Sequence, residues 1–251
     1  MTEKLIPIKT KEELALLRQA GKILSMITEE LKQYIREGMT TQDIDSKAAE
    51  LMATHNVKSA FKGYRGFPGT ICVSLNEEVV HGIPGKKVLK KGDIASIDVG
   101  IVANDYYSDT AFTVGIGDMD SEHQRLIDVT RDSLEKGIEE AKAGNHLSDI
   151  SFAIQDYVES KNFSVVKDFV GHGIGKMLHE EPEVPNFGLP HAGPLLKEGM
   201  VLAIEPMVNM GTWRTKILDD GWTVVTQDGK SSAHFEHTVA ITKAGPQILT
   251  R

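Results

Sequence analysis

Four acidic residues and one histidine lie where a soluble protein would normally place apolar side chains. Asp98, Asp109, Glu205 and Glu236 stand among β-branched or aromatic neighbours, and His172 lies in the string Gly-His-Gly-Ile-Gly. A buried carboxylate is rare unless it is paired or binds a metal. One such acid is commonly a satisfied structural group, and a histidine between glycines is more often a loop residue. Four acids in strand-like segments are harder to explain in that way.

This donor set is hard and rich in oxygen, because it has four carboxylates, one imidazole and no thiolate. It differs from a structural zinc site, which uses cysteine, and from a calcium cage, which has no histidine. It suits two Mn, Fe, Co or Zn ions about 3.5–4 Å apart, which would activate a water and polarise a carbonyl or phosphoryl oxygen. The residues therefore predict metal-assisted hydrolysis, with a phosphohydrolase as the generic alternative. The glycine-rich string lacks the spacing of nucleotide-binding loops, so phosphate binding is not expected there.

Asp98 and Asp109 flank a hairpin signal. The β-branched run before Ala103-Asn104-Asp105 and the run after it predict two antiparallel strands. If the loop is Ala103-Asn104, the two aspartates face each other directly, and if it is Asn104-Asp105 they are diagonal neighbours. Either register leaves both on one face, where like charges repel each other and favour a bound cation.

Helical patterns surround these strands. Periodic apolar residues predict one helix that begins with a capping box at Thr10 and is ended by Gly38, and a second helix after Thr41. A capping box at Ser121 begins a third helix, which reaches about residue 141, and a fourth helix spans about 148–160. Strands are expected over residues 70–80, interrupted by a turn at Asn76-Glu77, and over residues 163–170, 201–208, 222–226 and 233–242, the last two joined at Asp228-Gly229.

The two halves of the chain echo one another. Residues 89–98 (LKKGDIASID) match residues 196–205 (LKEGMVLAIE) at an offset of 107, so that Asp98 falls on Glu205. A second match, between 38–44 and 144–150, has an offset of 106. Two blocks at nearly one offset predict a duplication, which would bring the acids of two equivalent strands together. We expect one catalytic domain, residues 1–251, made of halves at about 10–115 and 120–251.

Composition limits the classes of function. The net charge of −8 argues against nucleic-acid binding, because no basic face is evident. Residues 1–7 lack the apolar core of a signal peptide, and no stretch approaches 18 apolar residues, so no membrane segment is expected. Cys72 is the one cysteine, which excludes an intrachain disulfide and fits a reducing cytosol.

Seven short motifs resemble those of the type I methionine aminopeptidases, and they cover nearly the whole chain. They read HGIP at 81–84, IDV at 97–99, DT at 109–110, GHGIG at 171–175, HEEP at 179–182, IEPMV at 204–208 and EHT at 236–238. The resemblance implies an α+β, pseudo-twofold "pita-bread" fold, with an antiparallel-rich central sheet backed by two pairs of helices. It also implies metal ligands Asp98, Asp109, His172, Glu205 and Glu236, of which Asp109 and Glu236 bridge two divalent ions (Co, Mn, Fe or Zn).

The resemblance assigns catalytic roles as well. His81 would lie near the substrate amine and the scissile nitrogen, and His179 near the scissile carbonyl oxygen. Glu205 would act as general base towards a metal-bridged water and then as proton donor. Without the resemblance, His81 would be a turn residue before Gly-Ile-Pro, and His179 a salt-bridged surface group before two glutamates.

The resemblance further implies an apolar methionine pocket, although each of its residues is also a plausible core residue. The implied lining is Phe61, Tyr64, Phe67, Cys72, Leu178 and Trp222. Leu178 departs from the aromatic residue often found there, and Phe61 replaces a smaller one, so the pocket should differ in shape. A weak monovalent-cation site is implied near Asn76 and Ser232.

The expected function is removal of the initiator methionine from nascent polypeptides with small second residues. We expect a cytoplasmic monomer that associates transiently with the ribosome. A proline-specific aminopeptidase or dipeptidase of the same fold is the alternative, and such relatives carry an extra N-terminal domain for which there is no room before Thr10. A form with a long insertion is disfavoured, since only 33 positions separate His172 from Glu205. A non-catalytic binding protein would be expected to have lost ligands.

Overall fold

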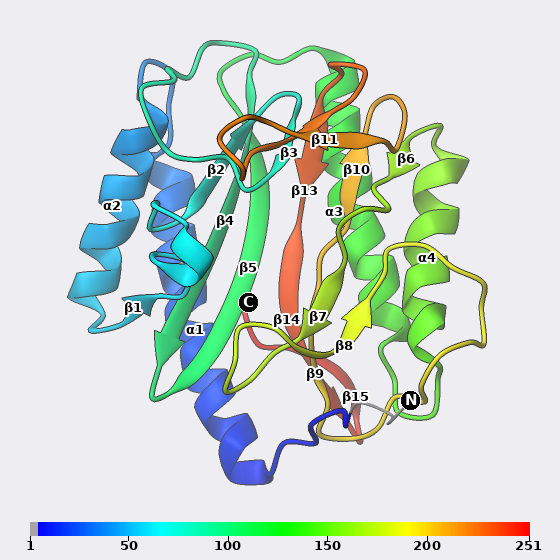
Figure 1. The fold of residues 1–251 in the computed structure, drawn as a ribbon. Coiled ribbons are helices and arrows are strands. Elements are labelled where there is room, and N and C mark those ends of the chain that lie inside the picture. Colours follow the sequence, from blue (N-terminus) through cyan, green and yellow to red (C-terminus); the bar gives the residue numbers. More distant parts are fainter. Residues whose placement is uncertain (1–4) are drawn as a thin grey trace.

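A curved antiparallel sheet forms the centre of the computed structural model, which describes residues 5–251 (Figure 1). Its main path runs in the order β1-β4-β5-β14-β9-β7-β8, with β2 paired to β4 and β15 paired to β14. The strands are β1 (Lys58–Ser59), β2 (Cys72–Leu75), β4 (Ile94–Ala103), β5 (Tyr106–Gly115), β7 (Gly171–Gly173), β8 (Glu180–Val184), β9 (Val201–Ile204), β14 (Glu236–Thr242) and β15 (Gly245–Ile248).

Two small sheets complete the strand layer. One has the order β13-β10-β6 and the other β11-β12-β3. Their bounds are β3 (Glu78–Val80), β6 (Ser164–Val165), β10 (Met207–Asn209), β11 (Thr215–Ile217), β12 (Val224–Thr226) and β13 (Ser232–His234). The predicted strand over 163–170 is therefore wrong in length, because only two of its residues find a partner, on β10.

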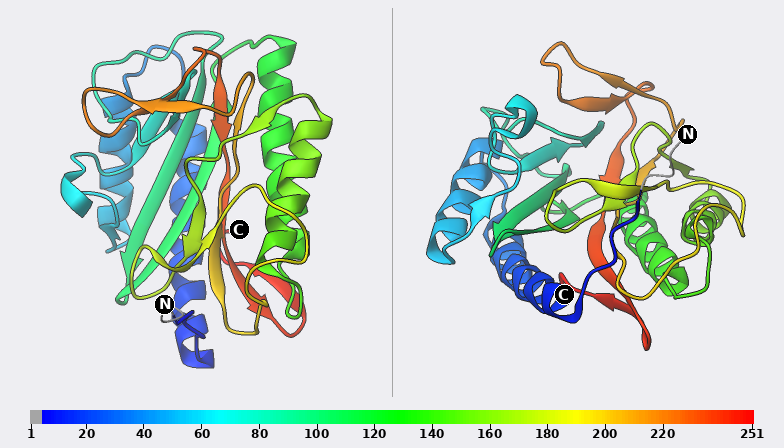
Figure 2. Two further views of the ribbon diagram at one scale, coloured as in Figure 1. Left: turned by 45° about the vertical axis from the view of Figure 1, so that its right-hand side comes forward. Right: turned by 60° about the horizontal axis from the view of Figure 1, so that its bottom comes forward.

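Two helix pairs flank the central sheet, which confirms the predicted fold class (Figure 2). The first pair is α1 (Lys11–Tyr34) and α2 (Thr41–Thr54), and the second is α3 (Ser121–Glu140) and α4 (Leu147–Ser160). Each pair has its own hydrophobic core. Leu24 and Ile44 pack with Ile97 in the first core, and Leu126 and Ile150 pack with Leu202 in the second.

The helix ends follow local chemistry. The capping box at Thr10 is confirmed, because the Thr10 and Glu13 side chains each accept a bond from the other's backbone N–H. The helix ends at Tyr34, before the predicted Gly38, since Ile35 already has an extended backbone.

The predicted capping box at Ser121 is wrong by one residue. Asp120 is the N-cap of α3, and its carboxylate accepts from the N–H of His123 at 2.9 Å. An ionised carboxylate is a strong acceptor at the positive end of a helix, which favours Asp120 over the hydroxyl next to it.

The hairpin between β4 and β5 turns at Asn104-Asp105, so the first of the two predicted registers is wrong. Both turn residues have positive φ, 51° and 62°, as a two-residue hairpin turn requires. Alanine at position 103 would tolerate this conformation poorly, which excludes Ala103-Asn104 as the loop. Gly100 therefore faces Asp109, and Asp98 is its diagonal neighbour on the same face.

The start of α2 and the start of α4 share one pattern of backbone hydrogen bonds. The bonds from Gly38 to Leu89, Thr41 to Lys87 and Gln42 to Gly85 correspond to those from Gly144 to Leu196, Leu147 to Pro194 and Ser148 to Ala192. The division into two related halves remains a prediction, and these matching bonds support it.

Within residues 5–251, no helix combines the length and the apolar character needed to cross a membrane. The prediction that the chain begins without a signal peptide concerns, in part, residues 1–4, which lie outside the described residues.

Candidate metal centre and substrate pocket

The five predicted metal ligands come from five neighbouring strands. Asp98 lies on β4, Asp109 on β5, Glu236 on β14 and His172 on β7, and Glu205 directly follows β9. Asp98 and Glu236 are both paired with Ala111, and His172 is paired with Ala203. The sheet itself therefore brings residues that are far apart in the sequence into one site.

The ligand atoms converge at short distances. One ligand atom each of Asp109, His172 and Glu236 lies within 4.8 Å of the others, and all three residues are buried. The His172 Nε2 atom lies 3.5 Å from Glu205 Oε1. Such spacing is close enough for these groups to share divalent ions.

The electrostatics of the four acids oppose their ionisation in the protein alone. Burial, followed by repulsion from neighbouring carboxylates, raises the pKa of Asp98, Glu205 and Glu236 well above the ordinary range. Burial also raises the pKa of Asp109 to about 7. Asp98 Oδ1 and Glu236 Oε1 have no hydrogen-bond partner among the described residues. A bound cation would satisfy these oxygens and offset the repulsion, so the residues fit a metal centre.

His172 is prepared to act as a ligand through one nitrogen. Its Nδ1 lies 2.9 Å from the carbonyl oxygen of Gly173, which can only accept, so Nδ1 carries the proton and Nε2 has the free lone pair. Burial, with a contribution from His179, lowers its pKa to about 3 and keeps the ring neutral. Glycine is required on both sides, because a Cβ at Gly171 or Gly173 would overlap backbone of the neighbouring strands.

His179 and His81 lie beside the five predicted ligands. The ring of His179 is 4.3 Å from that of His172, and its Nδ1 is hydrogen-bonded to the Tyr64 hydroxyl at 2.8 Å. His81 has a positive φ of 59°, and its ring packs edge-on against Phe169. Burial, followed by His179, lowers the pKa of His81 to about 4.

One cavity of about 180 Å³ collects every site residue that the sequence predicts. Its apolar wall is continuous with the carboxylates and includes Phe67 and Trp222, whose rings are 5.1 Å apart. The predicted residues that line it are Phe61, Tyr64, Phe67, Cys72, His81, Asp98, Asp109, His172, Leu178, His179, Glu205, Trp222 and Glu236.

Sequence reasoning missed two residues of the site. Arg65 lines the cavity from a left-handed backbone conformation, φ 48°, and its guanidinium lies 5.4 Å from the Tyr64 ring. His234 is 2% exposed, and its Nε2 lies 3.6 Å from Glu205 Oε2. A signal for His234 was available, because it precedes Glu236 by two residues and stands between Ala233 and Phe235.

The predicted monovalent-cation residues also meet. The N–H of Ser232 donates to the carbonyl oxygen of Asn76 at 2.8 Å. Asn76 has a positive φ of 54°.

The sequence is also similar to those of known proteins. Residues 15–243 match the model of metallopeptidase family M24. Methionine aminopeptidase 1 of Bacillus subtilis is 53% identical over 98% of this chain and 100% of its own length. The methionine aminopeptidase of Clostridium perfringens is 55% identical, over 98% of this chain and 99% of that protein.

Solved structures agree with the fold. The methionine aminopeptidase of Thermotoga maritima superposes with a TM-score of 0.97 at 48% identity, covering 98% of this chain and 100% of that one. A prolidase of Pyrococcus horikoshii has a TM-score of 0.78 at 22% identity, over 97% of this chain and 63% of its own, a likeness of fold alone. The chain belongs to metallopeptidase family M24, with the pita-bread fold, and within it to the methionine aminopeptidases.

Proposed function

We propose that this metallopeptidase hydrolyses the first peptide bond of peptides that begin with methionine, favouring small second residues. The observation that carries the proposal is the apolar cavity, which opens directly onto the five predicted ligands. The relatives that are 53% and 55% identical carry the name methionine aminopeptidase over nearly their whole length, which supports this substrate.

Family membership implies the use of divalent metal, and the donor set fits two such ions. We assign Asp98, Asp109, His172, Glu205 and Glu236 as the residues that would hold these ions; Asp109 and Glu236, with His172, have ligand atoms within 4.8 Å of one another. Mn, Fe, Co and Zn all suit four carboxylates and one imidazole. When bound, these ions supply Lewis acidity, which lowers the pKa of a water and polarises the scissile carbonyl.

Glu205 is the group we assign to proton transfer. Burial raises its pKa, so the carboxylate has a higher affinity for a proton than an exposed glutamate. It accepts the proton of the attacking water and returns it to the leaving amine. His234 Nε2 lies 3.6 Å from the second oxygen of this carboxylate.

The two neutral histidines act on the substrate. The Tyr64 hydroxyl lies 2.8 Å from His179 Nδ1. We assign the hydroxyl as the donor of this hydrogen bond, so that Nε2 of the neutral ring donates towards the scissile carbonyl oxygen. His81 lies beside Trp222, with ring centroids 6.2 Å apart. We assign it to contact with the substrate amine and the scissile nitrogen. The methionine side chain packs against the apolar wall that Phe67 and Trp222 help to form.

The test is peptide hydrolysis by metal-stripped protein after Mn or Co is added back, with Met-Ala-Ser and Ala-Pro offered side by side. We expect methionine release from the first peptide, only with metal. Cleavage of Ala-Pro in its place would overturn the substrate and retain the metal centre. Full activity of both Asp109→Asn and His172→Ala would overturn the ligand assignment.

Further properties accompany this function as proposals. They are a cytoplasmic location, a monomeric state, a transient association with the ribosome, and a weak monovalent-cation site at Asn76 and Ser232. The bond between Asn76 and Ser232 supports the last of them, because it fixes two oxygen-bearing residues side by side.

A further inference from the structure

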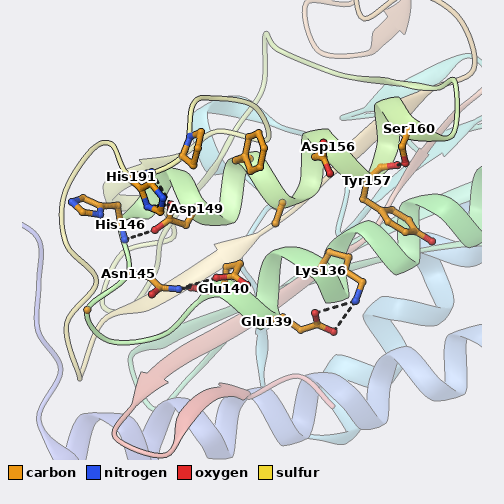
Figure 3. A pocket seen from close by; sticks show the side chains of 14 residues that line it. Lys136, Glu139, Glu140, Asn145, His146, Asp149, Asp156, Tyr157, Ser160 and His191 are labelled. Carbon is orange, nitrogen blue, oxygen red and sulfur yellow. Dashed lines mark hydrogen bonds and ion pairs between the residues drawn. The ribbon is translucent and has the colours of Figure 1, made fainter.

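Two histidines and one aspartate meet at the start of α4 (Figure 3). One ligand atom each of His146, Asp149 and His191 lies within 4.8 Å of the others. The Asp149 Oδ1 atom is 3.2 Å from His191 Nδ1, and the two imidazole rings are 6.3 Å apart. None of the three lines the cavity of the candidate metal centre. The cluster is therefore a separate group of donors.

The backbone holds this cluster in place. The Asp149 carboxylate accepts from the N–H of His146 at 2.8 Å and from the N–H of His191 at 2.7 Å. The Ser148 hydroxyl ties the same two segments together, because it donates to the Ala192 carbonyl and accepts from the Ala192 N–H. Each oxygen of Asp149 keeps a second lone pair for a further partner. A ligand would therefore meet donors that are already positioned.

The equivalent place in the first half is built without histidine. There the N–H of Thr40 donates to Asp43 Oδ2 at 2.7 Å and starts α2 in the same way. By the matching hydrogen bonds, Thr40 corresponds to His146 and Pro84 to His191. The two imidazoles are thus not needed to begin the helix or to attach the loop.

The charge around the cluster favours a cation. An open hollow of about 730 Å³ next to it is lined by the acids Glu139, Glu140, Asp149 and Asp156 against one lysine, Lys136. Lys136 is paired with Glu139, so the acids keep an excess of negative charge. Burial raises the pKa of Asp149, but the N–H donors of His191 and His146 lower it more, and the carboxylate stays ionised. A negative hollow raises the local concentration of cations.

We propose that His146, Asp149 and His191 form a peripheral site for Zn²⁺. Two imidazoles and one carboxylate suit a late first-row transition-metal ion such as Zn²⁺, whereas Ca²⁺ and Mg²⁺ prefer sites made of oxygen ligands alone. Three protein ligands leave a fourth position of a tetrahedral ion to water or a small anion. The bound ion joins the loop that carries His191 to the first turn of α4.

The experiment compares Zn²⁺ binding by the full chain and by variants in equilibrium dialysis with elemental analysis. His191→Gln removes one ligand from a side chain that is 80% exposed, so the fold should be kept. We expect this variant to bind one Zn²⁺ fewer per chain at micromolar free zinc, with unchanged methionine release. His55→Gln, which removes a histidine at the end of α2, is the matched control and should bind as much as the wild type.

A second readout identifies the ligands directly. In NMR spectra, ring protons of His146 and His191 should shift when Zn²⁺ is added, in the wild type and equally in an Asp109→Asn variant. Equal zinc content of the wild type and His191→Gln, or unshifted ring signals, would overturn the proposal. Because Asp109→Asn acts on the other centre alone, failure of the proposed function would be distinguishable from failure of this site.

Discussion

The hydrogen bond between Tyr64 and His179 determines which imidazole nitrogen offers a proton to the cavity. Burial, followed by the charge of Arg65, lowers the pKa of His179, so the ring is neutral at pH 7. A tyrosine hydroxyl can donate or accept, and when the Tyr64 hydroxyl donates to Nδ1 the neutral ring carries its proton at Nε2. That tautomer is the one that can donate to negative charge developing on a carbonyl oxygen.

We expect His179→Ala to lower kcat by about 10²–10³-fold, because one donor to the oxyanion is lost. Tyr64→Phe keeps the ring and removes the hydroxyl, so its kcat should fall less, by about tenfold. Steady-state kinetics on Met-Ala-Ser measures both, and metal content serves as the control, since neither residue is an assigned ligand. A His179→Ala enzyme with the kcat of the wild type would remove this histidine from the reaction.

The hairpin turn shows how a single element sets the spacing of the acids. Asn104 and Asp105 both adopt positive φ, which glycine tolerates best and β-branched residues tolerate worst. Moving the turn by one residue would place Asp109 opposite a different residue of β4 and move it relative to Asp98. The conformation of two exposed residues thus fixes the geometry of a buried pair.

Substitutions at the turn should therefore change stability with opposite signs. Asp105→Gly should stabilise the protein by about 0.5–1 kcal/mol, and Asp105→Val should destabilise it by about 1–2 kcal/mol. Chemical denaturation monitored by circular dichroism gives both values, with peptide hydrolysis as a check that the register is kept. A stabilised valine variant would contradict the role of positive φ.

Strand β7 packs so closely against its neighbours that it tolerates no side chain at Gly171. We expect Gly171→Ala to cost about 2–4 kcal/mol of unfolding free energy, because its Cβ would overlap the carbonyl of Ala203 on β9. The strand carries His172, so metal affinity should fall with stability. Gly85→Ala is the control: that glycine has an ordinary φ and no atom closer than 4.0 Å to an added Cβ. Equal effects of the two substitutions would contradict the argument.

Across the whole molecule, the sequence predicted the features that are encoded by a local pattern of residues. Acids among β-branched residues led to the prediction of Asp98 and Glu205 as ligands, and the predicted repeat related the two positions, because burial and duplication would both leave traces in the order of residues. The hairpin register stayed open, because it depends on the backbone conformation of Asn104 and Asp105, and the residue types alone allowed either of two turns.

The surroundings of the site were harder to predict, because they are assembled from distant segments. The ring of His81 is packed by Phe169 and Trp222, far away in the sequence, and only the family resemblance indicated its place. Arg65 gave no signal, because an arginine in a glycine-rich turn reads as a solvated residue.

The buried acids of the centre should make the stability of the metal-free protein depend on pH. In the metal-free protein the pKa of Asp109 is about 7 against an ordinary 3.8, and those of Asp98, Glu205 and Glu236 are also raised. A raised folded-state pKa means that the folded state binds more protons between the two values. The contribution of Asp109 to the unfolding free energy is therefore fully present below about pH 4, and it is lost as the pH rises through about 7. We expect the melting temperature of the metal-free chain, corrected for other groups, to fall over this range.

Divalent metal should reverse this loss, because it interacts favourably with the ionised carboxylates. Added Mn²⁺ should therefore raise the melting temperature more at pH 8 than at pH 5, as measured by calorimetry with and without a chelator. Asp109→Asn is the control, since an amide does not titrate: it should make the metal-free profile less steep between pH 4 and 7, while Asp98, Glu205 and Glu236 continue to titrate. If Mn²⁺ raised the melting temperature by the same amount at both pH values, the buried acids would not govern the stability of this centre.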